Sequence, residues 1–132
     1  MTVEYKNHDT LPTPIGLYSH VARTGNLVFF AGVTAMDATG RVIGKGDLEQ
    51  QMKASYAEMG EALRAEGLSY SNIVQMTTYL VRQQDIPEYY RVRAEAYTQM
   101  YPAGKYPPTV LVVVSQLVDA DFLIEIQFVA AE

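Results

Sequence analysis

The chain has 132 residues, a formal net charge of −5 and a sequence pI near 5.0. This length suits a single domain, residues 1–132, which can bury roughly two-thirds of the surface that its unfolded chain exposes. The acidic balance and the scattered Lys and Arg argue against a nucleic-acid surface, which requires clustered positive charge. Because the chain has no cysteine, disulfides, thiolate catalysis and Cys-ligated zinc are excluded.

The first ten residues, MTVEYKNHDT, are polar and do not form a secretory segment. No run of about 18 apolar residues occurs in the sequence, so a membrane span is not expected either. A cytoplasmic location is the default expectation.

The first half of the chain predicts a hairpin and a helix. Residues 16–23 and 27–35 are extended runs joined by Thr24-Gly25-Asn26, which has the turn chemistry of a β-hairpin. Residues 41–43 then form a candidate short edge strand. Asp47, with a glutamine three residues later, predicts a helix N-cap, and apolar residues at helical spacing continue until Gly67.

The second half predicts a strand, a helix and two more strands. Residues 73–81 are rich in β-branched and aromatic side chains, which favours a strand. Asp85, followed by Pro87 in the first turn, predicts a helix that runs to Met100. Strands are then expected at 109–117 and 122–130.

The predicted order, β-β-(β)-α-β-α-β-β, indicates an α+β fold in which two helices pack on one face of a mixed sheet. Residues 110–114 are all valine or leucine, so both faces of that strand should be covered. The helices can cover only one face. In a chain this small we expect copies of the same chain to cover the other, which predicts a homo-oligomer.

No motif for a metal or cofactor is present. His8 and His20 do not stand at a recognised ligand spacing, and neither has a carboxylate three or four residues further on. Serine-nucleophile motifs, phosphate-binding glycine loops and dinucleotide fingerprints are also absent. We therefore expect neither a metal nor a cofactor.

Two charged residues interrupt apolar patterns and allow alternative interpretations. Glu125 lies in LIEIQF, where Ile124 and Ile126 have the pattern of core residues. Its carboxylate either meets water at the sheet edge or lies between subunits, where burial raises its pKa and suits it to acid–base catalysis. Arg93 shares a helix face with tyrosines; it either reaches solvent or a subunit salt bridge, or binds an anion.

Six segments together resemble the reactive intermediate deaminase family, also called Rid or YjgF. They occur in the family's order and are spread over nearly the whole chain: GLYSH at 16–20, TGNLVFFAGV at 24–33, EALRAEGL at 61–68, NIVQMTTYLV at 72–81, YPPTVLVVVSQLV at 106–118 and LIEIQFVAAE at 123–132. The resemblance implies a chorismate-mutase-like fold, a homotrimer with a central barrel, and ligand clefts between neighbouring subunits. Deaminating members hydrolyse enamines and imines derived from amino acids, without a cofactor, and release ammonia and a 2-oxo acid.

The resemblance also implies site residues. Glu125 matches the first glutamate of the family's Ile-Glu-Ile-Glu strand and is the expected catalytic residue, while Tyr18 and Gly32 match ligand-contacting positions. The family's carboxylate-binding arginine, in a Pro-Ala-Arg-Ser motif, is replaced here by Thr109. Such charge-assisted bonds contribute roughly 1.5–3 kcal/mol, so efficient deamination of the simplest substrate, 2-aminoacrylate, is not expected. The backbone amide of Leu111 is a further expected ligand contact.

Our own hypothesis adds Arg93, which could restore positive charge to the cleft in place of the family arginine. Three functions stay open at this point. The first is deamination of an imine or enamine other than the simplest aminoacrylate, such as an aminomuconate-like or ring-opened unsaturated acid. The second is a non-catalytic small-metabolite-binding or regulatory trimer. RNA cleavage or translation inhibition is the third, and the acidic net charge of −5 disfavours it.

Overall fold

The computed structural model describes residues 2–132. It contains two α-helices and seven strands, whose bounds are α1 Leu48–Ala65, α2 Ile86–Met100, β1 Glu4–Lys6, β2 Val21–Thr24, β3 Leu27–Phe30, β4 Val33–Thr34, β5 Ile73–Leu80, β6 Thr109–Val113 and β7 Ile124–Ala131.

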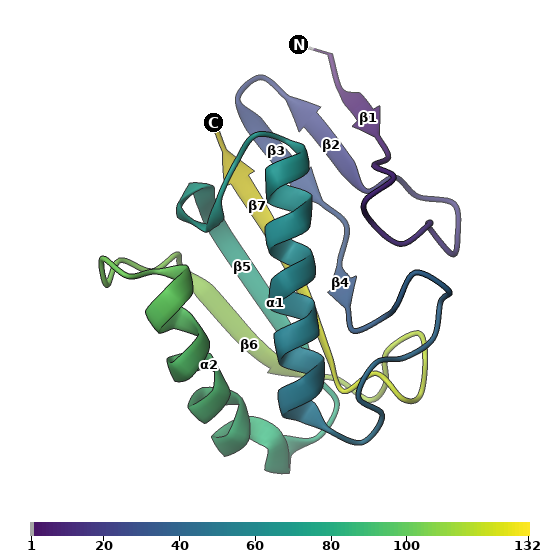
Figure 1. The fold of residues 1–132 in the computed structure, drawn as a ribbon, viewed down its shortest axis with the longest axis vertical. Helices are drawn as coiled ribbons and strands as arrows, with labels where there is room; N and C mark the ends of the chain where they lie inside the picture. The colour runs from purple at the N-terminus through teal and green to yellow at the C-terminus, as the bar shows by residue number, and fades with distance from the viewer. Residues whose placement is uncertain (1) are drawn as a thin grey trace.

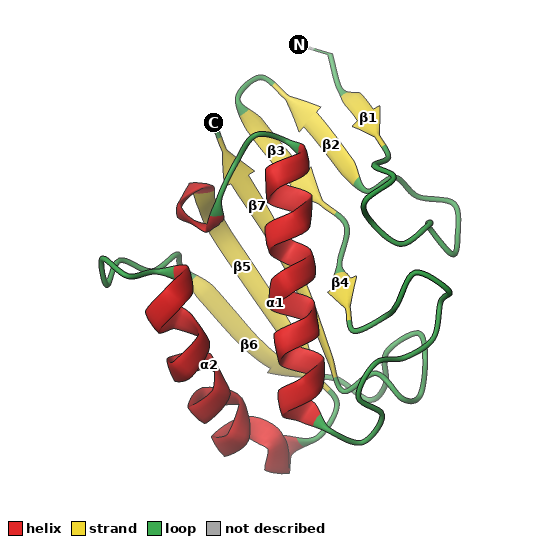
Figure 2. Cartoon of the chain, in the orientation of Figure 1, coloured by secondary structure: helices red, strands yellow, loops and turns green. Residues whose placement is uncertain are grey.

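The strands form one sheet in the order β1-β2-β3-β7-β5-β6, with β4 paired to β7. Strands β5 and β6 are parallel and connected through α2, whereas the other pairs are antiparallel. Both helices lie on the same face of the sheet (Figures 1 and 2). The predicted α+β class, a mixed sheet with two helices on one face, is confirmed.

Helix α1 begins and ends at the predicted signals. The side chain of Asp47 accepts a hydrogen bond from the backbone N–H of Gln50 at 3.0 Å, which satisfies one of the free donors of the first turn. Gly67 adopts φ 75° just past the end, a conformation that glycine takes without steric cost. The buried amide of Gln51 bonds Leu123 and Asp121, which fixes the start of α1 against the entry to β7.

Several strand predictions need correction. The hairpin is present, but β2 begins at Val21 because residues 16–20 form bends. Residues 41–43 contribute only an isolated bridge between Met36 and Val42, not a strand. Strand β6 ends at Val113 rather than at residue 117, and β1 was not predicted. Three residues are too short for an alternation pattern, so β1 carries no readable periodicity.

The two faces of the sheet differ. The side under the helices holds the core, where Phe30 and Phe128 stack with ring centroids 4.4 Å apart. The other side, which we call the open face, leaves Leu27, Phe29 and Val110 38%, 43% and 54% exposed. The expected cover on both faces of residues 110–114 is therefore not supplied by a single chain.

Candidate functional site

Glu125 lies on the open face in the middle of the sheet. Its Cα stands opposite Tyr79 on β5 and Thr34 on β4, while its neighbours Ile124 and Ile126 point into the core. The carboxyl group rests directly on Gly32, where an added Cβ would collide with it. The glycine is therefore required by the close approach of the carboxyl group.

Burial raises the pKa of Glu125 above its ordinary value. Among residues 2–132 no ion pair or hydrogen bond of its side chain is observed, so no cation opposes this effect. A carboxyl group that holds its proton to a higher pH than usual is suited to acid–base catalysis.

Tyr18 comes from the loop before β2 and is about half exposed. Its hydroxyl accepts a hydrogen bond from the backbone N–H of Ile15 at 3.3 Å. The ring lines a cavity of about 490 Å³ together with Phe29 and Ala31, the residue before Gly32. We call Tyr18, Gly32 and Glu125 the acid half of the site.

Arg93 and Thr109 come together on the helix side of the sheet. Arg93 projects from α2, Thr109 begins β6, and both line one cavity of about 570 Å³. Leu111 lies two residues further along β6 and packs against the hydrophobic core. We call Arg93, Thr109 and Leu111 the arginine half.

The backbone of β6 has a free edge at the arginine half. In the ladder with β5, the carbonyl of Pro108 accepts from Met76 and the N–H of Val114 donates to Leu80. Because alternate residues of a parallel strand bond the same neighbour, the N–H groups of Thr109 and Leu111 point away from β5. In the part of the chain that the structure describes, β6 pairs with no other strand, so these two donors remain available.

The two halves lie too far apart to share a small ligand within one chain. Glu125 is opposite Tyr79, which is opposite Val112, three residues beyond Thr109. With strands about 4.8 Å apart and a rise of about 3.3 Å per residue, the Cα atoms of Glu125 and Thr109 are roughly 14 Å apart. Their side chains also leave opposite faces of the sheet, so a site containing both requires a second copy of the chain.

Comparison with known proteins decides the family. A family model described as Endoribonuclease L-PSP matches residues 9–132. A RutC family protein of Pyrococcus horikoshii is 34% identical over 92% of this chain and 92% of its own length. The chain belongs to this family, which is the Rid/YjgF family. The chloroplastic Reactive Intermediate Deaminase A of Arabidopsis thaliana is 32% identical over 76% of this chain and 51% of its own length.

The fold of this Rid protein has solved counterparts. The crystal structure of Escherichia coli TdcF with bound serine superposes with a TM-score of 0.86 over 98% of each chain, at 24% sequence identity. At that identity the likeness establishes the fold alone.

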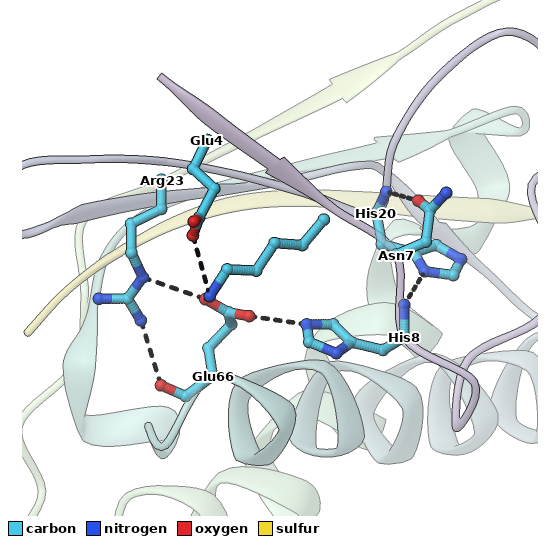
Figure 3. A network of polar contacts seen from close by, with 7 residues as sticks. Glu4, Asn7, His8, His20, Arg23 and Glu66 are labelled. Carbon is cyan, nitrogen blue, oxygen red and sulfur yellow. Dashed lines mark hydrogen bonds and ion pairs between the residues drawn. The ribbon is translucent and has the colours of Figure 1, made fainter. Parts of the chain in front are cut away.

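A second carboxylate cluster lies apart from both halves. The side chain of Glu66, at the C-terminus of α1, is 1% exposed and is surrounded by Lys6, His8 and Arg23, at distances of 3.5, 2.6 and 3.1 Å (Figure 3). Burial raises the pKa of Glu66, but hydrogen bonds from His8 and Arg23 and the charges of Lys6 and Arg23 outweigh it, and the pKa lies below its ordinary value. We call these four residues the Glu66 cluster; it attaches β1 and β2 to α1.

His8 and His20 make structural contacts in this region. The N–H of His8 donates to Nδ1 of His20 at 3.0 Å, and Nε2 of His20 lies 2.7 Å from the carbonyl oxygen of Pro12. Within residues 2–132 no group of three His, Asp or Glu side chains could hold a metal ion. The helices of that same range are also too short or too polar to cross a bilayer.

Sequence reasoning placed Arg93 among tyrosines of its own helix, but it missed Tyr101 and Tyr106, which extend this group beyond the end of α2. Tyr97, Tyr101 and Tyr106 contact one another with ring centroids 4.9 to 6.0 Å apart. Their spacing in the sequence gave a partial signal, because Tyr97 and Tyr101 are four residues apart on one helix face.

Proposed function

We propose that this Rid protein is a cofactor-independent deaminase that hydrolyses an imine or enamine carrying a carboxylate, in a cleft between copies of a homotrimer. The observation that carries the proposal is Glu125: an uncompensated carboxyl group, held against Gly32 on an uncovered sheet face, with a pKa raised by burial. The family includes a relative named Reactive Intermediate Deaminase A, which supports this class of reaction.

Glu125 would act as the acid–base group. As a carboxylate it takes a proton from water while the water oxygen bonds to the C=N carbon of the iminium, giving a neutral carbinolamine. The protonated Glu125 then gives its proton to the nitrogen, the C–N bond breaks with its electron pair on nitrogen, and ammonia leaves. Loss of the hydroxyl proton completes the 2-oxo acid, and an enamine enters the same route after protonation at carbon.

The arginine half of a neighbouring copy would bind the other end of the substrate. The free N–H groups of Thr109 and Leu111 and the charge of Arg93 are donors to a carboxylate. Three copies that join their open faces would cover the exposed Leu27, Phe29 and Val110 and bring the two halves together. Light scattering on the protein as it elutes from a size-exclusion column would measure the mass of the assembly. A monomeric mass would contradict a cleft shared between subunits.

The activity test uses imines generated from amino acids by an amino-acid oxidase, with release of ammonia and 2-oxo acid as the readout. We expect Glu125→Gln to lower the catalysed rate by about 10²–10⁴-fold, the range for removing a general acid–base group. The matched control is Glu58→Gln in α1, because burial also raises the pKa of Glu58, to about 7. Equal loss in both variants, or no acceleration by the wild type across the imine panel, contradicts the proposal.

Mixing subunits tests whether two chains share one site. Thr109→Trp fills the cavity of the arginine half and leaves Glu125 intact. Glu125→Gln removes the acid–base group and leaves that cavity intact. Each variant alone should be inactive. After unfolding and joint refolding, about a quarter of the clefts in a random trimer receive both intact halves, so about a quarter of the activity should return. No recovery, although mixed trimers form, contradicts a shared cleft.

A second candidate is a non-catalytic metabolite-binding or regulatory trimer. It is favoured by Thr109, which stands where the family resemblance leads us to expect a carboxylate-binding arginine. This candidate predicts that 2-oxo acids raise the melting temperature in both wild type and Glu125→Gln, with no imine hydrolysis in either. An unchanged melting temperature across the panel of 2-oxo acids argues against it.

A further inference from the structure

Arg93 occupies an unusual environment for a half-buried arginine. Its guanidinium carbon lies 5.3, 4.8 and 5.6 Å from the ring centroids of Tyr89, Tyr90 and Tyr97. In the described part of the chain no carboxylate forms an ion pair with it. Arg91, two residues earlier on the same helix, contacts Glu49, Glu88 and Glu95. The charge of Arg91 is thus neutralised, whereas that of Arg93 is held by aromatic rings and left without an anion.

The cavity beside Arg93 is large, and four tyrosines contribute to its wall. It measures about 570 Å³, which falls within the usual range of roughly 300–1,000 Å³ for sites that bind drug-sized molecules. The side chains that line it include Tyr90, Tyr97, Tyr101, Tyr106 and Pro107. A three-carbon imino acid would leave most of this space to water, so the walls suit a ligand with a flat apolar body.

Some polar groups of the residues lining this cavity already have partners: the hydroxyl of Thr98 donates to a backbone carbonyl, and that of Tyr97 to the sulfur of Met76. In the described part of the chain, the guanidinium of Arg93 has no ion pair, and the hydroxyl and backbone N–H of Thr109, on the edge of β6, have no hydrogen-bond partner. These groups remain available to a ligand.

We propose that the arginine half is a site for aromatic carboxylates, in which Arg93 binds the carboxylate and the tyrosines around it hold an aromatic ring. This rests on the proposed function and deepens it, because the substrate class becomes the imines of aromatic amino acids. Arg93 thereby supplies, from α2, the charge that Thr109 does not supply from β6. Its guanidinium is already ordered by three rings, so binding a carboxylate fixes little additional side-chain freedom.

Binding is tested with unreactive probes, which separates this inference from catalysis. The probes are 3-phenylpropanoate, propanoate, which lacks the ring, and 3-phenylpropanamide, which lacks the charge, each titrated calorimetrically into the purified full-length protein. We expect 3-phenylpropanoate to bind at least tenfold more tightly than either of the others. Arg93→Gln should weaken 3-phenylpropanoate by about 10–100-fold and make acid and amide bind alike.

Arg91→Gln is the matched control, since it removes an arginine from another face of the same helix. It should leave all three affinities unchanged. Arg93→Lys keeps the charge and the fold but loses the planar fork, and should give an intermediate affinity. The inference is overturned if propanoate binds as tightly as 3-phenylpropanoate, if Arg93→Gln and Arg91→Gln behave alike, or if no probe binds.

Catalysis then distinguishes the two proposals. If the probes bind as expected but no imine is hydrolysed, the proposed function fails and the binding site stands. If imines are hydrolysed with a rate constant kcat/KM that is the same in Arg93→Gln and wild type, the proposed function stands and the role of Arg93 fails. Support for both requires hydrolysis that favours the imine of phenylalanine over that of alanine, a preference lost in Arg93→Gln.

Discussion

Two carboxyl groups in this molecule, those of Glu66 and Glu125, lie in opposite electrostatic environments. Glu66 is almost fully enclosed but is met by Lys6, His8 and Arg23, and its pKa is lowered. Glu125 is less enclosed, yet no cation meets it, and its pKa is raised. The first arrangement is what a structural ion cluster requires, because an unpaired buried charge is destabilising. The second is destabilising to folding. Burial also raises the pKa of Glu58, so Glu125 is distinguished as a candidate for chemistry by its place against Gly32 on the open face.

The same contrast holds for the two arginines of α2. Arg91 lies among three carboxylates on the solvent side, and Arg93 lies among tyrosines beside a cavity. In both comparisons the residue in the proposed cleft is the one without an opposite charge. An ionisable group left uncompensated within a chain can be completed by a ligand or by another subunit.

The largest expected effect on stability comes from Glu66→Gln. The substitution leaves Lys6 and Arg23 without their shared anion, and breaking such a pair costs about 3 kcal/mol of unfolding free energy. For a chain of this size that lowers the melting temperature by about 10 °C. Glu125→Gln, measured in the same chemical denaturation at pH 7, should not lower the unfolding free energy. Equal destabilisation by the two variants would remove the contrast between the carboxyl groups.

The helix ends and the position of Glu125 could be located from the sequence more directly than the contacts of Arg93 could. Asp47 and Gly67 bound α1 as expected, and Glu125 interrupts an apolar alternation that can be read directly. These signals are local, because each depends on residues within one helix or strand. The resemblance to the Rid family added Tyr18 and Gly32, and the structure places Gly32 against Glu125.

The Glu66 cluster and the tyrosine-lined cavity could not be predicted in this way. Glu66 meets residues 43, 58 and 60 positions earlier in the chain, and no periodicity links such distant positions. Tyr106 contacts Tyr97 across the turn that follows α2. The expectation that Arg93 and Thr109 share a cleft was a hypothesis about tertiary contact, and both do line one cavity.

A second prediction concerns how closely Glu125 is held. Gly32→Ala places a methyl group where the carboxyl group lies, so the carboxyl group must move, and a displacement of about 1 Å costs roughly 100-fold in rate. Gly16→Ala is the control, since its Cβ would meet only ordinary contacts of 3.7 Å to the ring of Tyr18. Imine hydrolysis by the two variants gives the comparison; a fully active Gly32→Ala protein contradicts the positioning of Glu125.

The smallest effect is a pair of pH dependences with opposite signs. The folded-state pKa of Glu125 is raised, so the native protein binds more protons than the unfolded chain just above the ordinary carboxyl pKa, and this side chain lowers stability as pH rises through that window. The folded-state pKa of Glu66 is lowered, so its contribution is complete above the ordinary pKa and is lost as pH falls through the folded value.

Unfolding free energies at one protein concentration, from pH 7 down to about pH 2, would show both trends. The advantage of Glu125→Gln over the wild type should shrink as pH falls, because the wild-type carboxyl group becomes protonated and no longer opposes folding. The deficit of Glu66→Gln should also shrink, but only at the acidic end, because the wild-type ion cluster is lost there. When the unfolding free energy of each variant minus that of the wild type is plotted against pH, the two curves should approach zero from opposite sides. Curves on the same side of zero would mean that folding shifts the pKa of both carboxyl groups in the same direction.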